Sequence, residues 1–318
     1  MADYASGSLW FYAPNKGAPV AFAVLFAISG AVHAVQNTRY HCWVVSGFLP
    51  VAALCFVAGF ILREIGAFDF SNLNIYIASQ VLLYVGPPFY ETANYLLIGR
   101  VLYYVPYMSP AHPAIIQTSF LLVDVAIAAL TSNGASRLAN YKEPWPSQNA
   151  GLIEVKVALV LQVVCMVSFI AVTARYHYNC HRGGVLIDAL RPCLITLYAS
   201  CTLITIRTIY RVAEIFGFGA LTAATSLSPL VTHEWFFWVF EASLMLSNSL
   251  LQNIFFPRRY LPRSFKTYLA RDGVTELDGP GYKDLKPREI WALFRGRKTM
   301  NYWEQEESAH EVAPVTNV

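Results

Sequence analysis

The sequence predicts an all-α integral membrane protein built as a bundle of seven transmembrane helices. The first observation is composition: 14% of the 318 residues are charged, 56% are hydrophobic and the mean hydropathy is +0.42. Soluble domains contain about 25% charged residues, so a chain this poor in charge needs lipid to cover part of its surface. The second observation is that seven apolar stretches are long enough for a helix to cross the hydrocarbon. They are about 19–36, 43–62, 73–103, 114–133, 151–175, 189–211 and 235–256.

The third stretch, 73–103, is long enough to tilt or to extend beyond the membrane. It contains Pro87 and Pro88 near its middle, and a proline inside a helix removes a backbone hydrogen bond. We therefore expect a kink or break there, with the freed backbone groups partnered inside the protein or in a wet cavity.

Basic residues in the short loops predict an N-terminus outside and a C-terminus inside, because cytoplasmic loops are enriched in Lys and Arg. In this orientation the inner side holds ten basic residues and the outer side four. The inner residues are Arg39, Arg100, Arg175, Arg182, Arg191, Arg258, Arg259, Arg263, Lys266 and Arg271, and the outer ones are Lys16, Arg63, Arg137 and Lys142.

The chain accordingly divides into three parts. Residues 1–18 form an extracellular N-terminal segment, 19–256 the transmembrane domain and 257–318 a polar, charged cytosolic tail. We expect the tail to be largely disordered, with 288–295 as a candidate amphipathic helix on the inner leaflet.

Charged residues at the end of the sixth stretch and along the seventh are the first candidates for function, since ionisable groups in a bilayer are costly. Arg207, Arg211 and Glu214 share one helix face at spacings i, i+4 and i+7, and Arg211 can pair with Glu214. Arg207 needs an acid from another helix, and Glu241 is the candidate. Glu241 and Asn248 lie seven residues apart on one stripe. Either a structural ion pair or a clamp for an anionic or zwitterionic headgroup fits this pattern.

The third and fourth stretches contain further buried polar candidates. Glu91, Asn94 and Tyr95 share a face just after the double proline, and Asp124 lies in the fourth stretch. They fit a substrate path or a purely structural bundle equally well. Glu64 and Glu234, near the predicted outer interface, are expected to be structural ion-pair or anchor residues.

Motifs for several other functions are absent from the sequence. There is no Walker A, HExxH or GxSxG pattern, and no basic patch with interleaved aromatics that would indicate nucleic acid. His177 and His181, with Cys180 beside them, have zinc-ligand spacing, but Arg175 and Arg182 flank them and no acid is near. We expect no metal, no cofactor and no catalytic residue.

The order of these features resembles the fungal lipid-translocating exporter family, seven-helix proteins that include sphingoid long-chain base exporters and aminocholesterol-resistance proteins. The run Arg207-x-x-Tyr210-Arg211-x-x-Glu214 is the most diagnostic piece. The other matching residues are Tyr12, Pro14, Glu64, Gly66, Pro87, Ala93, Tyr95, Gly99, Arg100, Asp124, Gly134, Gly151, Gln162, Glu234 and Pro257. Departures are Thr131, Ala135 and Phe256, where the family usually has Gln, Gly and His, and Glu241 in place of Asp.

The resemblance implies a transporter of amphipathic lipid-like or hydrophobic toxic molecules, with an efflux or resistance role. Its partner would be a membrane lipid or amphipathic small molecule, and its location the plasma membrane or another fungal endomembrane. Two alternatives remain: a seven-helix receptor or sensor of lipid or drug response, and a membrane-embedded enzyme acting on a lipid or a hydrophobic secondary metabolite, with Asp124, Glu91 or Glu241 as general acids.

Overall fold

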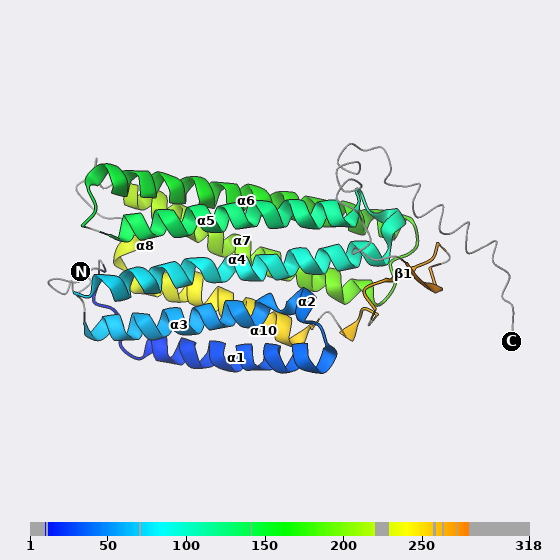
Figure 1. The fold of residues 1–318 in the computed structure, drawn as a ribbon, viewed down its shortest axis with the longest axis horizontal. Helices are drawn as coiled ribbons and strands as arrows, with labels where there is room; N and C mark the ends of the chain where they lie inside the picture. Colours follow the sequence, from blue (N-terminus) through cyan, green and yellow to red (C-terminus); the bar gives the residue numbers. More distant parts are fainter. Residues whose placement is uncertain are drawn as a thin grey trace, which may run out of the picture.

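The protein is an elongated helical bundle in the computed structural model, which describes residues 10, 12–69, 71–140, 142–219, 229–256, 259–262, 264–271 and 273–279 (Figure 1). The long helices are α1 (Ala18–Tyr40), α3 (Phe48–Phe68), α4 (Leu73–Tyr104), α5 (Pro113–Ala139), α6 (Trp145–Arg182) and α7 (Leu190–Gly219). The short helices are α2 (Trp43–Ser46), the 3₁₀-helix η1 (Pro106–Met108) and α8 (Pro229–Thr232). Helix α9 (Glu234–Phe237), the π-helix η3 (Trp238–Ser243) and α10 (Leu244–Ile254) follow one another without a gap.

Helices form at all seven apolar stretches, and most run past the predicted ends. Among the described residues, five helical segments are long and apolar enough to cross a membrane: α1, α2 with α3, α5, α6 and α7. Helix α4 and the segment 234–254 are not among them, so the count of seven spans stays a prediction, as does the orientation.

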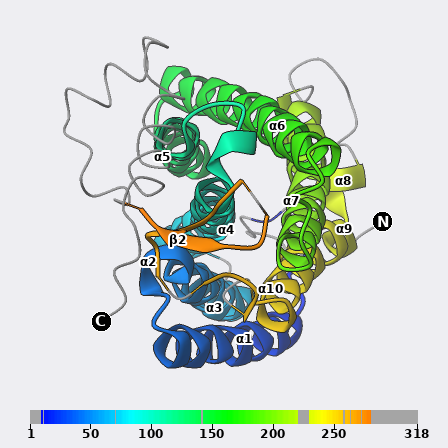
Figure 2. The ribbon, with the colours of Figure 1, turned by 90° about the vertical axis from the view of Figure 1, so that its right-hand side faces the viewer.

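Helix α4 lies near the middle of the bundle, and the other long helices surround it (Figure 2). It packs against α3, α5 and α7, and from Gly86 to Tyr104 all its residues are buried except Phe89, Thr92 and Leu96. A helix covered by protein does not need an apolar surface, which explains why polar residues are tolerated along it.

The two prolines of α4 do not interrupt it, because the helix continues from Leu73 to Tyr104 through both. The expected break is therefore wrong, whereas a bend stays a prediction. The second predicted stretch is divided instead: α2 ends at Ser46 and α3 begins at Phe48. Pro50 cannot donate to the Ser46 carbonyl, and the Asn37 amide donates to that oxygen at 3.0 Å.

A β-hairpin covers one end of α4, within the segment expected to be a largely disordered tail. Strands β1 (Thr267–Leu269) and β2 (Glu276–Asp278) pair antiparallel. The buried Arg100 guanidinium donates to the carbonyls of Thr267 at 3.1 Å and Ser264 at 2.6 Å, and the Tyr104 hydroxyl donates to Glu276 at 2.8 Å. These contacts order part of the tail. The candidate amphipathic segment 288–295 lies outside the described residues.

Two glycines allow α5 and α6 to approach closely. A Cβ atom at Gly134 would lie 2.7 Å from the Gly151 carbonyl oxygen, and one at Gly151 would lie 2.8 Å from the Gly134 carbonyl oxygen. Neither backbone can move aside without separating the helices, so this is a small-residue helix contact of the kind that stabilises membrane bundles.

We predict that Gly134→Val destabilises the bundle by about 1–3 kcal/mol, since the added atoms overlap α6. The measurement is thermal unfolding of the purified protein in detergent. Ala129→Val, at an exposed position of the same helix, is the control and should leave the melting temperature unchanged. Equal melting temperatures for the two variants would contradict the packing argument.

Candidate functional site

A buried ion network joins α7 to the π-helix η3. The Arg207 guanidinium binds both carboxylate oxygens of Glu241, with Nε–Oε2 at 2.7 Å and Nη2–Oε1 at 2.8 Å. Arg211 donates from Nε to the same Glu241 Oε2 at 2.7 Å and from Nη1 to Glu214 at 2.6 Å. The structure thus confirms the two pairings that the spacing predicts, Arg207 with Glu241 and Arg211 with Glu214.

Three of the four residues of the network are almost completely removed from solvent, and the side chain of the fourth, Glu214, is 18% exposed. Arg207 and Arg211 are 1% and 3% exposed, and Glu241 is 0% exposed. Two arginines and two glutamates give no net charge, which makes the burial tolerable. A buried bidentate pair is costly to desolvate and is seldom a net source of stability, so a purely structural role does not by itself explain its presence.

The π-helix places Glu241 at the centre of this network. Residues 238–243 form a single wide turn between α9 and α10. Such turns are rare and are frequent at functional sites, because they shift the side chains that follow relative to an ordinary helix. Sequence spacing alone does not reveal this turn.

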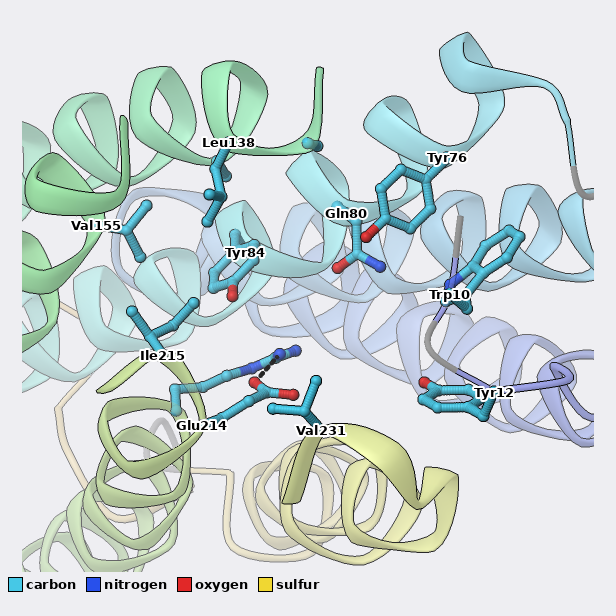
Figure 3. Close-up of a pocket in the computed structure, with 13 residues that line it drawn as sticks. Trp10, Tyr12, Tyr76, Gln80, Tyr84, Leu138, Val155, Glu214, Ile215 and Val231 are labelled. Atoms are coloured by element: carbon cyan, nitrogen blue, oxygen red, sulfur yellow. Dashed lines mark hydrogen bonds and ion pairs between the residues drawn. The ribbon is translucent and has the colours of Figure 1, made fainter. Parts of the chain in front are cut away.

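A cavity of about 120 Å³ opens beside the network, at the end of the bundle where α4 begins (Figure 3). Figure 3 shows Tyr76, Gln80 and Tyr84 approaching from α4, and Glu214 and Ile215 from α7. Arg211 also lines it, with its guanidinium carbon 4.7 Å from the centre of the Tyr84 ring. The Nη2 atom of Arg211 is buried and has no hydrogen-bond partner among the described residues. The cavity therefore has an aromatic wall with a cationic side chain beside it.

Further polar side chains continue from the network along the interface of α4, α7 and α10. Asn94 donates to the Ser200 hydroxyl at 2.8 Å, and Gln252 donates to Ser200 at 3.3 Å. Asn248 lies on α10 between Glu241 and Gln252 and is 0% exposed. Neither its Nδ2 nor its Oδ1 atom has a partner within the part of the chain that the structure describes. We call these residues, from Glu214 to Ser200 and Gln252, the polar column.

The predicted candidates Glu91, Tyr95 and Asp124 form a second group, between α4, α5 and α6. Gln162 donates to Glu91 Oε1, and the Tyr95 hydroxyl donates to Glu91 Oε2 at 3.3 Å. Thr92 donates to Asp124 Oδ2 at 2.9 Å. No hydrogen bond between described residues joins this group to the polar column, so its members stay predicted substrate-path candidates.

Glu64 and Glu234 lie near the N-terminal segment. The Gly17 amide donates to Glu64 at 3.0 Å, and Glu234 accepts from the Asn15 amide and from Arg63, both at 2.8 Å. The Tyr12 hydroxyl accepts from Arg63 at 2.7 Å. Burial raises the pKa of the Tyr12 phenol, so it stays a neutral partner for the arginine.

Arg63 is the residue that sequence reasoning missed. It was assigned to an outer loop with the residues used for orientation, but it lies within α3 and is 1% exposed. Its guanidinium carbon is 4.2 Å from the centre of the Phe237 ring. The sequence contains one signal of this burial: Arg63 directly follows an apolar run and has no second basic residue nearby. Arg100 was also counted as a loop residue and is buried in α4.

The comparisons with known proteins decide the family. A sequence profile described as "RTA1 like protein" matches residues 49–264, more than half of the chain. The chain belongs to the RTA1-like family. The matched range contains the whole polar column, the Glu91 group and Arg63. This match confirms the resemblance to the lipid-translocating exporter family. The protein is an all-α, multi-pass integral membrane protein.

Relatives of the RTA1-like chain are fungal. A lipid-translocating exporter-like protein RTA1 of Leptosphaeria maculans is 38% identical over 290 residues, covering 86% of this chain and 56% of the relative. Protein RTA1 of Saccharomyces cerevisiae is 24% identical over 313 residues, 89% of this chain and 95% of that protein. Protoporphyrin uptake protein 1 of the same yeast is 26% identical over 279 residues, 75% and 88% of the two chains. The chain spans a little over half of the Leptosphaeria relative. No solved structure matches this RTA1-like chain.

We predict that Glu241→Gln lowers the free energy of unfolding by about 3–5 kcal/mol, because it leaves the Arg207 guanidinium buried without a counterion. The double variant Arg207→Met, Glu241→Gln removes both charges and should recover most of that loss. Thermal unfolding in detergent measures both.

The matched control is Glu154→Gln, which breaks the exposed Arg137–Glu154 pair between α5 and α6, whose closest atoms are 3.4 Å apart. An exposed pair contributes about 0–1 kcal/mol. If Glu241→Gln is as mild as Glu154→Gln, the network is not desolvated as described.

Proposed function

We propose that the protein translocates amphipathic, lipid-like molecules across a fungal membrane, in an efflux or resistance role. The printed names of the relatives support this class, since one is a lipid-translocating exporter-like protein and another a protoporphyrin uptake protein. These names favour transport over the receptor and the enzyme. The proposed location is the plasma membrane, which efflux from the cell requires, with seven spans and the N-terminus outside.

The observation on which the proposal rests is the unpartnered polar groups of the polar column. Asn248 is fully buried with neither amide atom hydrogen-bonded to a described residue, and Arg211, which lines the cavity, has a buried Nη2 donor without a partner among the described residues. Burying such a group without a partner costs about 1–3 kcal/mol. A polar ligand that forms these hydrogen bonds when it enters accounts for their retention.

The length of the polar column also fits the proposed role. On α7 it extends from Glu214 to Ser200, fourteen residues, which is about 21 Å at the helical rise of 1.5 Å per residue. The hydrocarbon of a bilayer is about 30 Å thick. A column of this length shields a headgroup over most of its passage, while the apolar chains stay in lipid.

The ion network suits a charged or zwitterionic headgroup. Arginine binds phosphate or carboxylate bidentately, and the buried Nη2 atom of Arg211 has no hydrogen-bond partner among the described residues. An anionic group that displaces Glu214 or Glu241 from the arginines adds one negative charge to the neutral network, and a cationic group adds one positive charge. A zwitterionic headgroup adds no net charge, because its cationic part can pair with the displaced glutamate, so it fits the network best.

We predict that Asn248→Leu abolishes transport without harming the fold. Leucine has a similar volume and removes the unpartnered amide, so the melting temperature should stay the same or rise, while leaflet exchange falls about tenfold or more. The measurement uses the full chain in sealed liposomes with fluorescent phospholipid and long-chain-base analogues.

Asn133→Leu is the control for this experiment. Asn133 lies at the α5–α6 surface, where it donates to Glu154 at 2.7 Å, outside the polar column. Its exchange rate should match the unmodified protein. Exchange that Asn248→Leu leaves intact, or no exchange above protein-free liposomes with any lipid, would refute the proposed function.

A further inference from the structure

Two carboxyl groups lie buried beside each other where α4 packs against α5. Glu91 is 0% exposed and Asp124 is 2% exposed. Glu91 accepts hydrogen bonds from Gln162 and Tyr95, and Asp124 Oδ2 accepts one from Thr92. Thr92, which donates to Asp124, directly follows Glu91 in α4, so the two carboxyl groups lie at the same contact of α4 with α5 and are close enough to interact electrostatically. The ion network of the polar column does not include either of them.

Neither carboxyl group has a basic partner among the residues that the structure describes. Within the described ranges, no Lys or Arg nitrogen lies within the 4.0 Å limit of an ion pair to Glu91 or Asp124. Arg207 acts on Glu91 from a distance, but its guanidinium is bound to Glu241. Two adjacent carboxylates in an apolar interior, both ionised and without a counterion, would be very costly.

One oxygen atom of the carboxyl pair lacks a hydrogen-bond donor in the described part of the chain. Asp124 Oδ1 is buried and has no donor among the described residues. Its neighbour Glu91 offers only acceptor oxygens while ionised, because a carboxylate cannot donate. One proton between the two groups provides the absent donor and removes one negative charge, as in other sites where two carboxyl groups share a proton.

We propose that Glu91 and Asp124 form a proton-binding site, and that its proton is the coupling ion of the translocation proposed above. The coupling rests on the proposed function, whereas the proton-binding site does not. The other ionisable groups that face the pair are Tyr95 on α4, Cys165 on α6, and Cys201 and Arg207 on α7. Only Arg207 among them is a base, and it is already occupied.

Helix α4 connects the carboxyl pair to the polar column. Asn94, which donates to Ser200 in the column, lies one turn beyond Glu91 on the same helix. Glu91 also interacts electrostatically with Arg207 of the ion network. Loss of the proton raises the uncompensated negative charge beside α4 from one to two, which favours a more hydrated arrangement of the bundle. Binding of a headgroup in the polar column and binding of a proton at the carboxyl pair therefore affect each other through α4.

The site is tested by infrared difference spectroscopy of the full chain in liposomes during a pH titration. A protonated carboxyl group has a distinct C=O stretching band. We expect this band in the unmodified protein and its loss in Glu91→Gln and Asp124→Asn. Asp188→Asn, at a carboxylate whose side chain is 99% exposed, is the control and should leave the band unchanged. Absence of the band in the unmodified protein near neutral pH, where exposed carboxyl groups are ionised, would overturn the site.

The coupling is tested in the same liposomes with an imposed pH gradient. If one proton moves with each lipid, a gradient of one pH unit drives about a tenfold ratio of the fluorescent lipid between leaflets. The ratio should be one in Glu91→Gln and Asp124→Asn whatever the gradient. A ratio of one in the unmodified protein, with exchange still present, would overturn the coupling. No exchange at all would refute the proposed function, while the infrared band would still decide the proton site.

Discussion

The pairing of two arginines with Glu241, buried in an apolar bundle, is the interaction on which the rest of the structure depends. It joins α7 to the π-helix η3, which precedes α10, and it forms one end of the polar column. With Glu214, which binds Arg211, the network has two positive and two negative charges, and both arginine side chains are nearly inaccessible. Such a network is expensive to desolvate, and removal of one partner leaves a buried charge without a counterion.

Helix α4 packs against α7 beside this network. It lies inside the bundle, so one of its faces can hold Glu91 against α5 and α6 while another holds Asn94 against α7 and α10. Helix α4 thereby contacts two polar groups of different chemistry. The glutamates of the ion network are neutralised by arginines, whereas the Glu91–Asp124 pair has no basic partner among the described residues. The hairpin held by Arg100 covers the far end of α4 and ties the chain after residue 256 to the same element.

Much of this arrangement could be predicted from the sequence. The apolar stretches located the helices, and the spacing of Arg207, Arg211 and Glu214 identified one face with Glu241 as the acid opposite. The sequence could not show the π-turn at 238–243, because it depends on the packing of one extra residue into a helix rather than on a residue type. Arg63 was misplaced since a basic residue at the end of an apolar run is also typical of a loop. Helix α4 continues through Pro87 and Pro88 although each proline lacks a backbone donor, so a proline in the sequence did not fix where the helix ends. Glu91 accepts from Gln162 of α6, whereas Asn94 donates to Ser200 of α7, and helical spacing within α4 does not specify which neighbour each face meets.

The central claim is that a lipid headgroup enters the polar column while its chains stay outside. The most direct measurement is photocrosslinking of the full chain in liposomes with two phospholipid analogues, one with a diazirine in the headgroup and one with a diazirine in the acyl chain, followed by mass spectrometry of the labelled peptides. The account predicts that the headgroup probe labels α4, α7 and 234–254 around Asn248, and that the chain probe labels lipid-facing residues such as Val157 and Val164 of α6. Headgroup labelling confined to those outer residues would contradict it.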